Sequence, residues 1–368
     1  MQGILYPDKG KNEIIPIEIG YIVCDQRHLY KLISIKRSIL FVLLFQLVLI
    51  VKAQNKEVEV EALKLLEMYD PMGHYILSET INAPSNYNFD GQKMFLSGSK
   101  KFARYIQGKE TDDIIQSLNT VVHEMTHGYS HKLTYKILKE MGEQPDFKTQ
   151  YLAIPISEEE SILITQTETF SSKKLAEVIP DALKTFRFKT YIKSKNPILS
   201  TQQSGIYGLL NEFSAYYHGT RASYNTFQYY TGKAEITNQD YLDYLSDVNS
   251  TRNAYLEFKY YILQYLIYAK KHNRTVYNGV IANERFKDAF RKIDALFSQL
   301  QKDYSDRRKE ISDLLTEKGI RVHYDDDVDW IGTSGVGSFQ DEYNALKTEL
   351  EKQIYINLLN DLGSQSGN

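Results

Sequence analysis

Residues 121–133 read VVHEMTHGYSHKL, a stretch that holds three of the eight histidines of the chain. In the longer segment 111–133, the apolar residues gather in one broad arc when positions are placed at 100° intervals. His123 and His127 lie close together on the opposite side of this predicted helix, with Glu124 beside them. The stretch therefore predicts an amphipathic helix that packs against a core and carries two imidazoles on its other face.

The spacing His-Glu-x-x-His is the one that a helical zinc site requires. Residues i and i+4 are one turn apart, so two imidazole nitrogens can converge on one tetrahedral ion. The adjacent Glu can orient a water molecule on the zinc and take its proton. We interpret His123 and His127 as zinc ligands and Glu124 as the general base; a surface helix with coincidental histidines is the alternative. His131 lies roughly 12 Å beyond His123 along the helix axis, too far to share the ion.

A catalytic zinc ion usually takes one further protein ligand. The segment 205–219 reads GIYGLLNEFSAYYHG and predicts a second helix, on which Glu212 is the expected third ligand. Gly208, one turn earlier, can let another backbone approach closely, and Tyr216, one turn later, can donate to a carboxylate or to the reacting oxyanion.

Other carboxylates could take the same place. Glu158, Glu159 and Glu160 in SEEES are typical of a solvated charged turn, and Glu168 lies within a strand pattern. A His₂Glu set is a common catalytic zinc arrangement, which favours Glu212.

The two motifs together resemble those of the gluzincin metallopeptidases, the thermolysin-like group, in which HExxH is followed by G-x-x-N-E. Gly208, Asn211 and Glu212 match the second motif letter for letter. The resemblance implies a zinc peptidase with both motif histidines and Glu212 as ligands. The chain departs from the family pattern at Tyr216, where the family has an Asp that orients a histidine. Glu212 also follows His127 by 85 positions, a longer separation than in the family.

The chemistry that these residues imply is hydrolysis of a peptide amide, in a peptide or protein substrate. Tyr216 is the expected donor to the tetrahedral oxyanion, with Tyr207, His218 and His131 as other candidates. One alternative is a catalytically degenerate zincin-fold binding or scaffold protein; another is a zinc hydrolase of cell-wall peptides. The intact Glu124 favours catalysis, because a general base has no structural role that would preserve it.

The N-terminal residues 1–53 predict a signal peptide with an N-terminal extension. Two basic residues precede the apolar run 39–51, which is too short for a comfortable membrane span and suits a signal-peptide core, with cleavage after Ala53. An uncleaved anchor is the alternative. We therefore expect an exported protein, periplasmic or extracellular, with no membrane span in the mature chain. The only cysteine, Cys24, lies in the part that would be removed.

Beyond this segment the pattern predicts an α+β fold that is predominantly helical. We expect a zincin-like catalytic core over 54–235, made of a small sheet and the HExxH helix, with a β-rich insertion at 150–194 that includes RFKTYIKS. A helical C-terminal subdomain, a bundle, would follow over 236–368. The formal net charge of −3 gives no indication of a nucleic-acid partner.

Two shorter patterns carry further expectations. HYILSETI (74–81) and GQKMFLSG (91–98) read as strands separated by a turn-rich segment. The acidic run HYDDDVDWIG (323–332) reads as a solvated linker before the last helix, with a calcium loop as the alternative.

Overall fold

The computed structural model describes residues 55–96, 100–146, 148–325 and 327–363. The chain from residue 55 onward forms one compact unit. The predicted signal peptide, 1–53, lies outside the described residues. Among the residues that are described, no helix is both long enough and apolar enough to cross a membrane.

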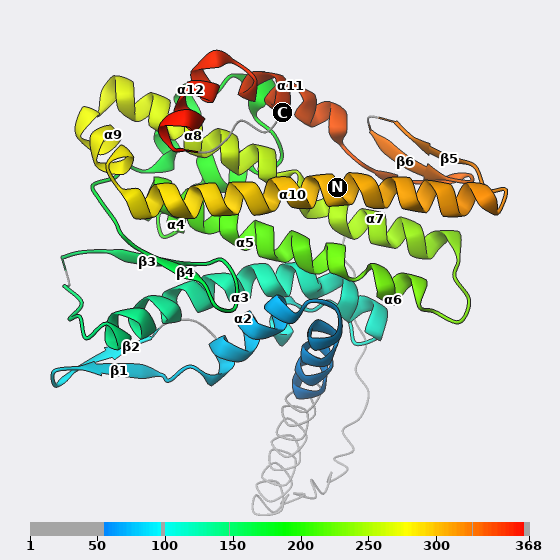
Figure 1. Cartoon of the computed structure of the whole chain (residues 1–368), viewed down its shortest axis with the longest axis horizontal. Coiled ribbons are helices and arrows are strands. Elements are labelled where there is room, and N and C mark those ends of the chain that lie inside the picture. Colours follow the sequence, from blue (N-terminus) through cyan, green and yellow to red (C-terminus); the bar gives the residue numbers. More distant parts are fainter. Residues whose placement is uncertain (1–54, 97–99, 147, 326, 364–368) are drawn as a thin grey trace, which may run out of the picture. The chain divides into compact units, whose positions relative to one another are not determined.

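This unit has an α+β fold that is predominantly helical (Figure 1). Residues 55–69 are helical. The helices that follow are α2 (Pro71–Asn82), α3 (Thr111–Glu140), α4 (Ser200–Gln203), α5 (Ile206–Asn225), α6 (Phe227–Thr231), α7 (Asn238–Arg252), α8 (Ala254–His272), α9 (Arg274–Ile281), α10 (Glu284–Glu317), α11 (Gln340–Leu350) and α12 (Gln353–Asp361).

The strands form small antiparallel sheets. They are β1 (Asn86–Phe89) with β2 (Gln92–Phe95), β3 (Tyr151–Pro155) with β4 (Ser161–Thr165), and the sheet of β5 (Val322–Tyr324), β6 (Val328–Ile331) and β7 (Ser334–Gly337). The β1–β2 hairpin turns at Asp90 and Gly91, whose φ angles of 46° and 87° are left-handed. An Asp-Gly pair suits this turn because the second position in particular favours glycine.

Helix α5 lies at the centre of the unit, with α3 on one side and α8 and α10 on the other (Figure 1). One hydrophobic cluster joins α5 to β3, β4, α8, α10 and α12. A second cluster joins α3 to residues 55–69, α2, α7 and the C-terminal part of α10. Each cluster draws on residues from both of the predicted regions, 54–235 and 236–368, so the two helices that carry the predicted zinc motifs are held by both parts of the chain.

The predicted strand at 74–81 is wrong, because this segment belongs to helix α2. The helix begins with a strong local signal: the Asp70 carboxylate accepts a hydrogen bond of 3.1 Å from the Gly73 backbone N–H, and Pro71 occupies the first turn. An N-cap aspartate followed by proline favours a helix over the strand propensity of the residues that come after. The strand expected at 91–98 is present in its first half, as β2.

The region 150–194 contains fewer strands than its composition suggests. β3 and β4 are strands, but RFKTYIKS is not, since Phe188–Ile192 form a short π-helical turn. Phe188, Tyr191 and Ile192 are all buried in the first cluster. Their spacing of three and four residues is helical, so a turn buries all three together whereas a strand would not.

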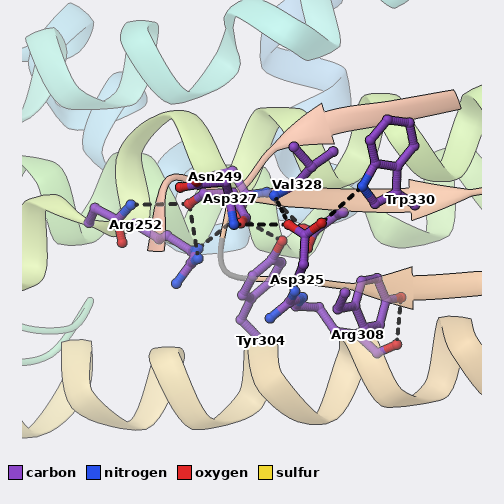
Figure 2. Close-up of polar contacts among 12 residues, drawn as sticks. Asn249, Arg252, Tyr304, Arg308, Asp325, Asp327, Val328 and Trp330 are labelled. Atoms are coloured by element: carbon purple, nitrogen blue, oxygen red, sulfur yellow. Dashed lines mark hydrogen bonds and ion pairs between the residues drawn. The ribbon is translucent and has the colours of Figure 1, made fainter. Parts of the chain in front are cut away.

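The acidic run 323–332 is not a solvated linker, since it forms the β5–β6 hairpin (Figure 2). Asp325 closes the turn by accepting hydrogen bonds from the backbone N–H of Asp327, at 3.0 Å, and from the Trp330 indole, at 3.1 Å. Asp329 is fully buried and pairs with Arg308. The carboxylates of Asp325 and Asp329 therefore stabilise this small sheet.

Candidate metal centre

Helices α3 and α5 cross in close contact at the two predicted zinc motifs. α3 begins with a capping box in which the side chains of Glu110 and Asp113 each accept from the other residue's backbone N–H. A Cβ on Gly219 of α5 would lie 2.6 Å from the carbonyl oxygen of Asn119 and 3.2 Å from the Cβ of His123. Glycine is therefore required where α5 passes the first histidine, and this close crossing brings the two motifs together.

The structure brings His123, His127 and Glu212 together. The two Nε2 atoms lie 3.3 Å apart, and they lie 3.6 Å (His123) and 3.3 Å (His127) from Oε2 of Glu212. A tetrahedral ion with bonds of about 2.0–2.1 Å holds its ligand atoms roughly 3.3–3.4 Å apart. The three separations therefore match the edges of one face of a tetrahedral zinc site.

Access to this set of atoms is greatest at the second histidine. The His127 side chain is 26% exposed, whereas those of His123 and Glu212 are 10% and 5% exposed. Solvent therefore reaches these ligand atoms mainly on the side of His127.

Two neighbouring side chains orient the ligand atoms. The Asn211 amide oxygen lies 3.1 Å from Nδ1 of His127, so that Nδ1–H donates to it and Nε2 is the nitrogen that faces Glu212. The Ser200 hydroxyl donates to Oε1 of Glu212 at 3.2 Å, which leaves Oε2 to face the two imidazoles. Hydrogen bonds of this kind fix the tautomer of a histidine ligand and the direction of a carboxylate ligand.

Gly208 explains how Ser200 reaches Glu212. A Cβ at position 208 would lie 2.2 Å from the Ser200 carbonyl oxygen and 2.6 Å from the Thr201 nitrogen. The start of α4 therefore packs directly on the backbone of α5, as the glycine in the motif led us to expect. This approach places the Ser200 hydroxyl one helical turn away, at the carboxylate.

The environment shifts the pKa values of His123, His127 and Glu212 in different directions. Burial lowers the pKa of His123, and the neighbouring His127 lowers it further. Burial also disfavours the charged form of His127, but the negative charge of Glu212 and the contacts with Glu212 and Asn211 outweigh it and raise the His127 pKa. The pKa of Glu212 is lowered, because His127 and the Ser200 hydrogen bond outweigh its burial. The metal-free site thus holds a Glu212 carboxylate against a His127 imidazolium.

One buried oxygen indicates that the donor set suits a cation. Oε2 of Glu212 is buried and accepts no well-directed hydrogen bond from the described residues, and His127 balances its charge from 3.3 Å. Two imidazole nitrogens and one carboxylate oxygen are ligands that zinc prefers, and an ion among them would satisfy Oε2.

Comparisons with protein-family models, with curated proteins and with solved structures found no match to this chain. The resemblance to the gluzincins therefore rests on the two motifs and on the contacts that their side chains make.

Glu124 lies on α3 beside the first histidine, and its side chain is partly exposed. It makes no hydrogen bond and no ion pair with any residue in the described ranges. Its negative charge is close enough to His127 to favour the protonated imidazole. A carboxylate that neighbours the ligand set and has no structural partner is available to accept a proton from water.

Tyr216 packs its ring against His123, with the ring centroids 4.3 Å apart. Its hydroxyl lies 3.0 Å from that of Tyr191, and the Arg187 guanidinium lies 4.5 Å from the centre of its ring. Arg187 is in turn held by a buried ion pair of 2.7 Å with Glu257. His123 is therefore positioned by aromatic packing with Tyr216, at the place where gluzincins have a carboxylate.

The remaining sequence candidates lie outside the ligand set. Nε2 of His218 donates to the Pro155 carbonyl at 3.1 Å, the Tyr207 hydroxyl bonds to Thr167, and the ring of His131 packs against Tyr135. Among the rival acids, Glu160 pairs with Lys292. Within the described ranges, no group of metal-ligating side chains includes Glu158, Glu159, Glu160 or Glu168.

Sequence reasoning missed Ser200, Arg187 and Tyr191, which lie near the ligand set without belonging to either motif. Asn211 was visible as a motif letter, but its bond to His127 was not. No spacing rule links Ser200 to Glu212, because their contact depends on how α4 packs on α5.

Proposed function

We propose that this protein is a zinc-dependent metallopeptidase that hydrolyses peptide amide bonds and acts outside the cytoplasm. The observation that carries the proposal is the placement of Nε2 of His123, Nε2 of His127 and Oε2 of Glu212 within 3.3–3.6 Å of one another. These atoms come from two helices, and Glu124 stands next to the first ligand. Two imidazoles and a carboxylate with an adjacent free carboxylate are the donor set and base of a hydrolytic zinc site.

When bound, zinc supplies a Lewis acid that acidifies water and polarises the substrate carbonyl. Glu124 orients the attacking water, takes its proton and returns that proton to the leaving amine. The hydroxyl pair of Tyr216 and Tyr191 supplies the donor to the oxyanion. One of its two hydroxyl hydrogens lies between the oxygens, and the other remains free to donate.

The finer fold assignment belongs to the same proposal. α3 carries the HExxH motif and contacts the small β3–β4 hairpin, and α5 supplies the third ligand. A helix with this motif beside a small sheet supports a zincin-like catalytic core.

The experiment that tests the proposal measures zinc content and peptide hydrolysis in the purified protein and in Glu124→Gln. We expect about one zinc per chain in both, cleavage by the wild type, and a loss of rate of about 10²–10⁴-fold in the variant, as removal of a general base predicts. Glu140→Gln is the matched control, because Glu140 is an exposed carboxylate on the same helix. Zinc retention with equal cleavage by wild type and Glu124→Gln would refute the mechanism.

A binding or scaffold function is the second candidate, and one observation favours it. Nδ1 of His123 has no partner in the described chain, whereas the second nitrogen of a zinc-bound histidine is usually hydrogen-bonded. Zinc binding without cleavage of unstructured proteins or of cell-wall peptides would support this second function. Cleavage of cell-wall peptides alone would keep the zinc chemistry and narrow the substrate class.

A further inference from the structure

A cavity of about 290 Å³ lies between the α7–α8 junction, α10 and α11, and none of its lining residues is a predicted zinc ligand. Among its lining residues are three cations, Arg252, Arg308 and Lys347, and no described carboxylate. The other polar lining groups are amides, phenols and a serine hydroxyl. A cavity with this lining in a chain of net charge −3 is locally positive.

A network of polar contacts joins the two arginines to Asn249 and Tyr304 (Figure 2). Nε of Arg252 donates to the Asn249 amide oxygen at 2.7 Å, and the Tyr304 hydroxyl donates to the same oxygen at 2.9 Å. Nδ2 of Asn249 donates to Asp329 at 3.0 Å, and Asp329 also accepts from Arg308. Both guanidinium groups are thus fixed in place by side chains of α7, α10 and β6.

The positive charge at this cavity is only partly neutralised. Asp329 pairs with Arg308, whereas Arg252 makes no ion pair with a described residue and meets only the neutral oxygens of Asn249 and Ser338. Burial, together with the neighbouring Arg308 charge, holds the pKa of Arg252 below its usual range, even though Tyr304 and Asp329 act in the opposite direction. Lys347 has no described hydrogen-bond or ion-pair partner. At least one positive charge at the cavity therefore has no ion-pair partner among the described residues.

We propose that this cavity binds an anionic monosaccharide, a sugar that carries a phosphate or carboxylate group. Arg252 and Lys347 take the oxyanion, because guanidinium and ammonium groups form charge-assisted hydrogen bonds with such groups. The side-chain amides of Asn253, Gln301 and Asn344 both donate and accept, as sugar hydroxyls do. The volume lies near the lower end of ligand pockets, which suits one sugar unit.

Isothermal titration of the full chain with glucose 6-phosphate, glucuronate, glucose and inorganic phosphate tests this proposal. We expect saturable binding of at least one of the two acidic sugars, and which of them binds identifies the oxyanion. Binding should be at least about tenfold weaker in Lys347→Gln and in Arg252→Gln, a difference of about 1.4 kcal/mol. Lys347 is exposed and has no described partner, so its variant is expected to fold.

Arg285→Gln is the matched control, since Arg285 is an exposed cation on α10 that does not line the cavity. Three results would overturn the proposal: no saturable binding of either acidic sugar, equal binding by wild type and both cavity variants, or glucose or inorganic phosphate binding as tightly as the acidic sugars. Because the readout is binding and not hydrolysis, failure here is independent of the zinc proposal.

Discussion

Replacing Gly208 by alanine should disturb the proposed third zinc ligand, Glu212, without contacting it. The new Cβ would lie 2.2 Å from the Ser200 carbonyl oxygen, and ordinary contact begins at 3.4 Å, so α4 and α5 must separate by about 1.2 Å. The hydrogen bond from Ser200 to Glu212 is already 3.2 Å long, and such a shift breaks it. We expect a loss of about 1–3 kcal/mol in the free energy of unfolding from overpacking. Zinc affinity should fall about 10–100-fold, as loss of a bond that orients a ligand predicts.

Urea denaturation of the metal-free protein measures the first effect, and competition with a chelator of known affinity measures the second. Gly128→Ala is the control for a helical glycine, because the nearest atom to its added Cβ is a methyl group of Thr80 at 3.6 Å. That variant should be stabilised by up to about 1 kcal/mol. Ser200→Ala removes the hydroxyl alone and should lower zinc affinity with little overpacking. Unchanged zinc affinity in both Gly208→Ala and Ser200→Ala would refute the role assigned to the Ser200 contact.

Three further predictions concern charge. Zinc binding at pH 7 should release about one proton, because the raised pKa of His127 keeps its imidazole protonated beside Glu212 until the ion displaces the proton. Titration calorimetry in buffers of different ionisation enthalpy measures this proton release. A binding heat that does not depend on the buffer would contradict the prediction. The same raised pKa stabilises the metal-free fold fully below about pH 6.5, and that stabilisation is lost as the pH rises through the folded-state pKa. Glu257→Gln should cost about 3–5 kcal/mol in urea denaturation, because it leaves the Arg187 charge buried and unpaired. Glu61→Gln, at an exposed ion pair, should cost less than about 1 kcal/mol, and equal losses would refute the difference in burial as the cause.

The HExxH helix could be predicted from the sequence because its information is local. The apolar arc and the i, i+4 spacing of His123 and His127 together define a face, and the structure has one helix over Thr111–Glu140. Glu212 could be named only through its motif. Its approach to the histidines depends on the crossing at Gly219, which no periodicity indicates.

The errors in the fold have equally physical causes. Residues 74–81 have strand propensity, but the cap at Asp70 and the proline after it start a helix. The acidic run 323–332 looks solvated because a sequence does not show that Arg308, many residues away, neutralises Asp329 inside the protein. Contacts between distant parts of the chain decide both the burial of a charge and the orientation of a ligand.

The contact between His127 and Glu212 also bears on the resistance of the protein to unfolding and degradation. The chain has one cysteine, so no disulfide within the chain can stabilise it. A zinc ion shared by residues 127 and 212 would close a loop of 85 residues, which contains the β3–β4 hairpin. By the relation used for disulfide loops, such a cross-link lowers the conformational entropy of the unfolded chain and raises its free energy by about 4–5 kcal/mol. The supply of zinc around the protein would then set its resistance to unfolding and to degradation, as well as its activity.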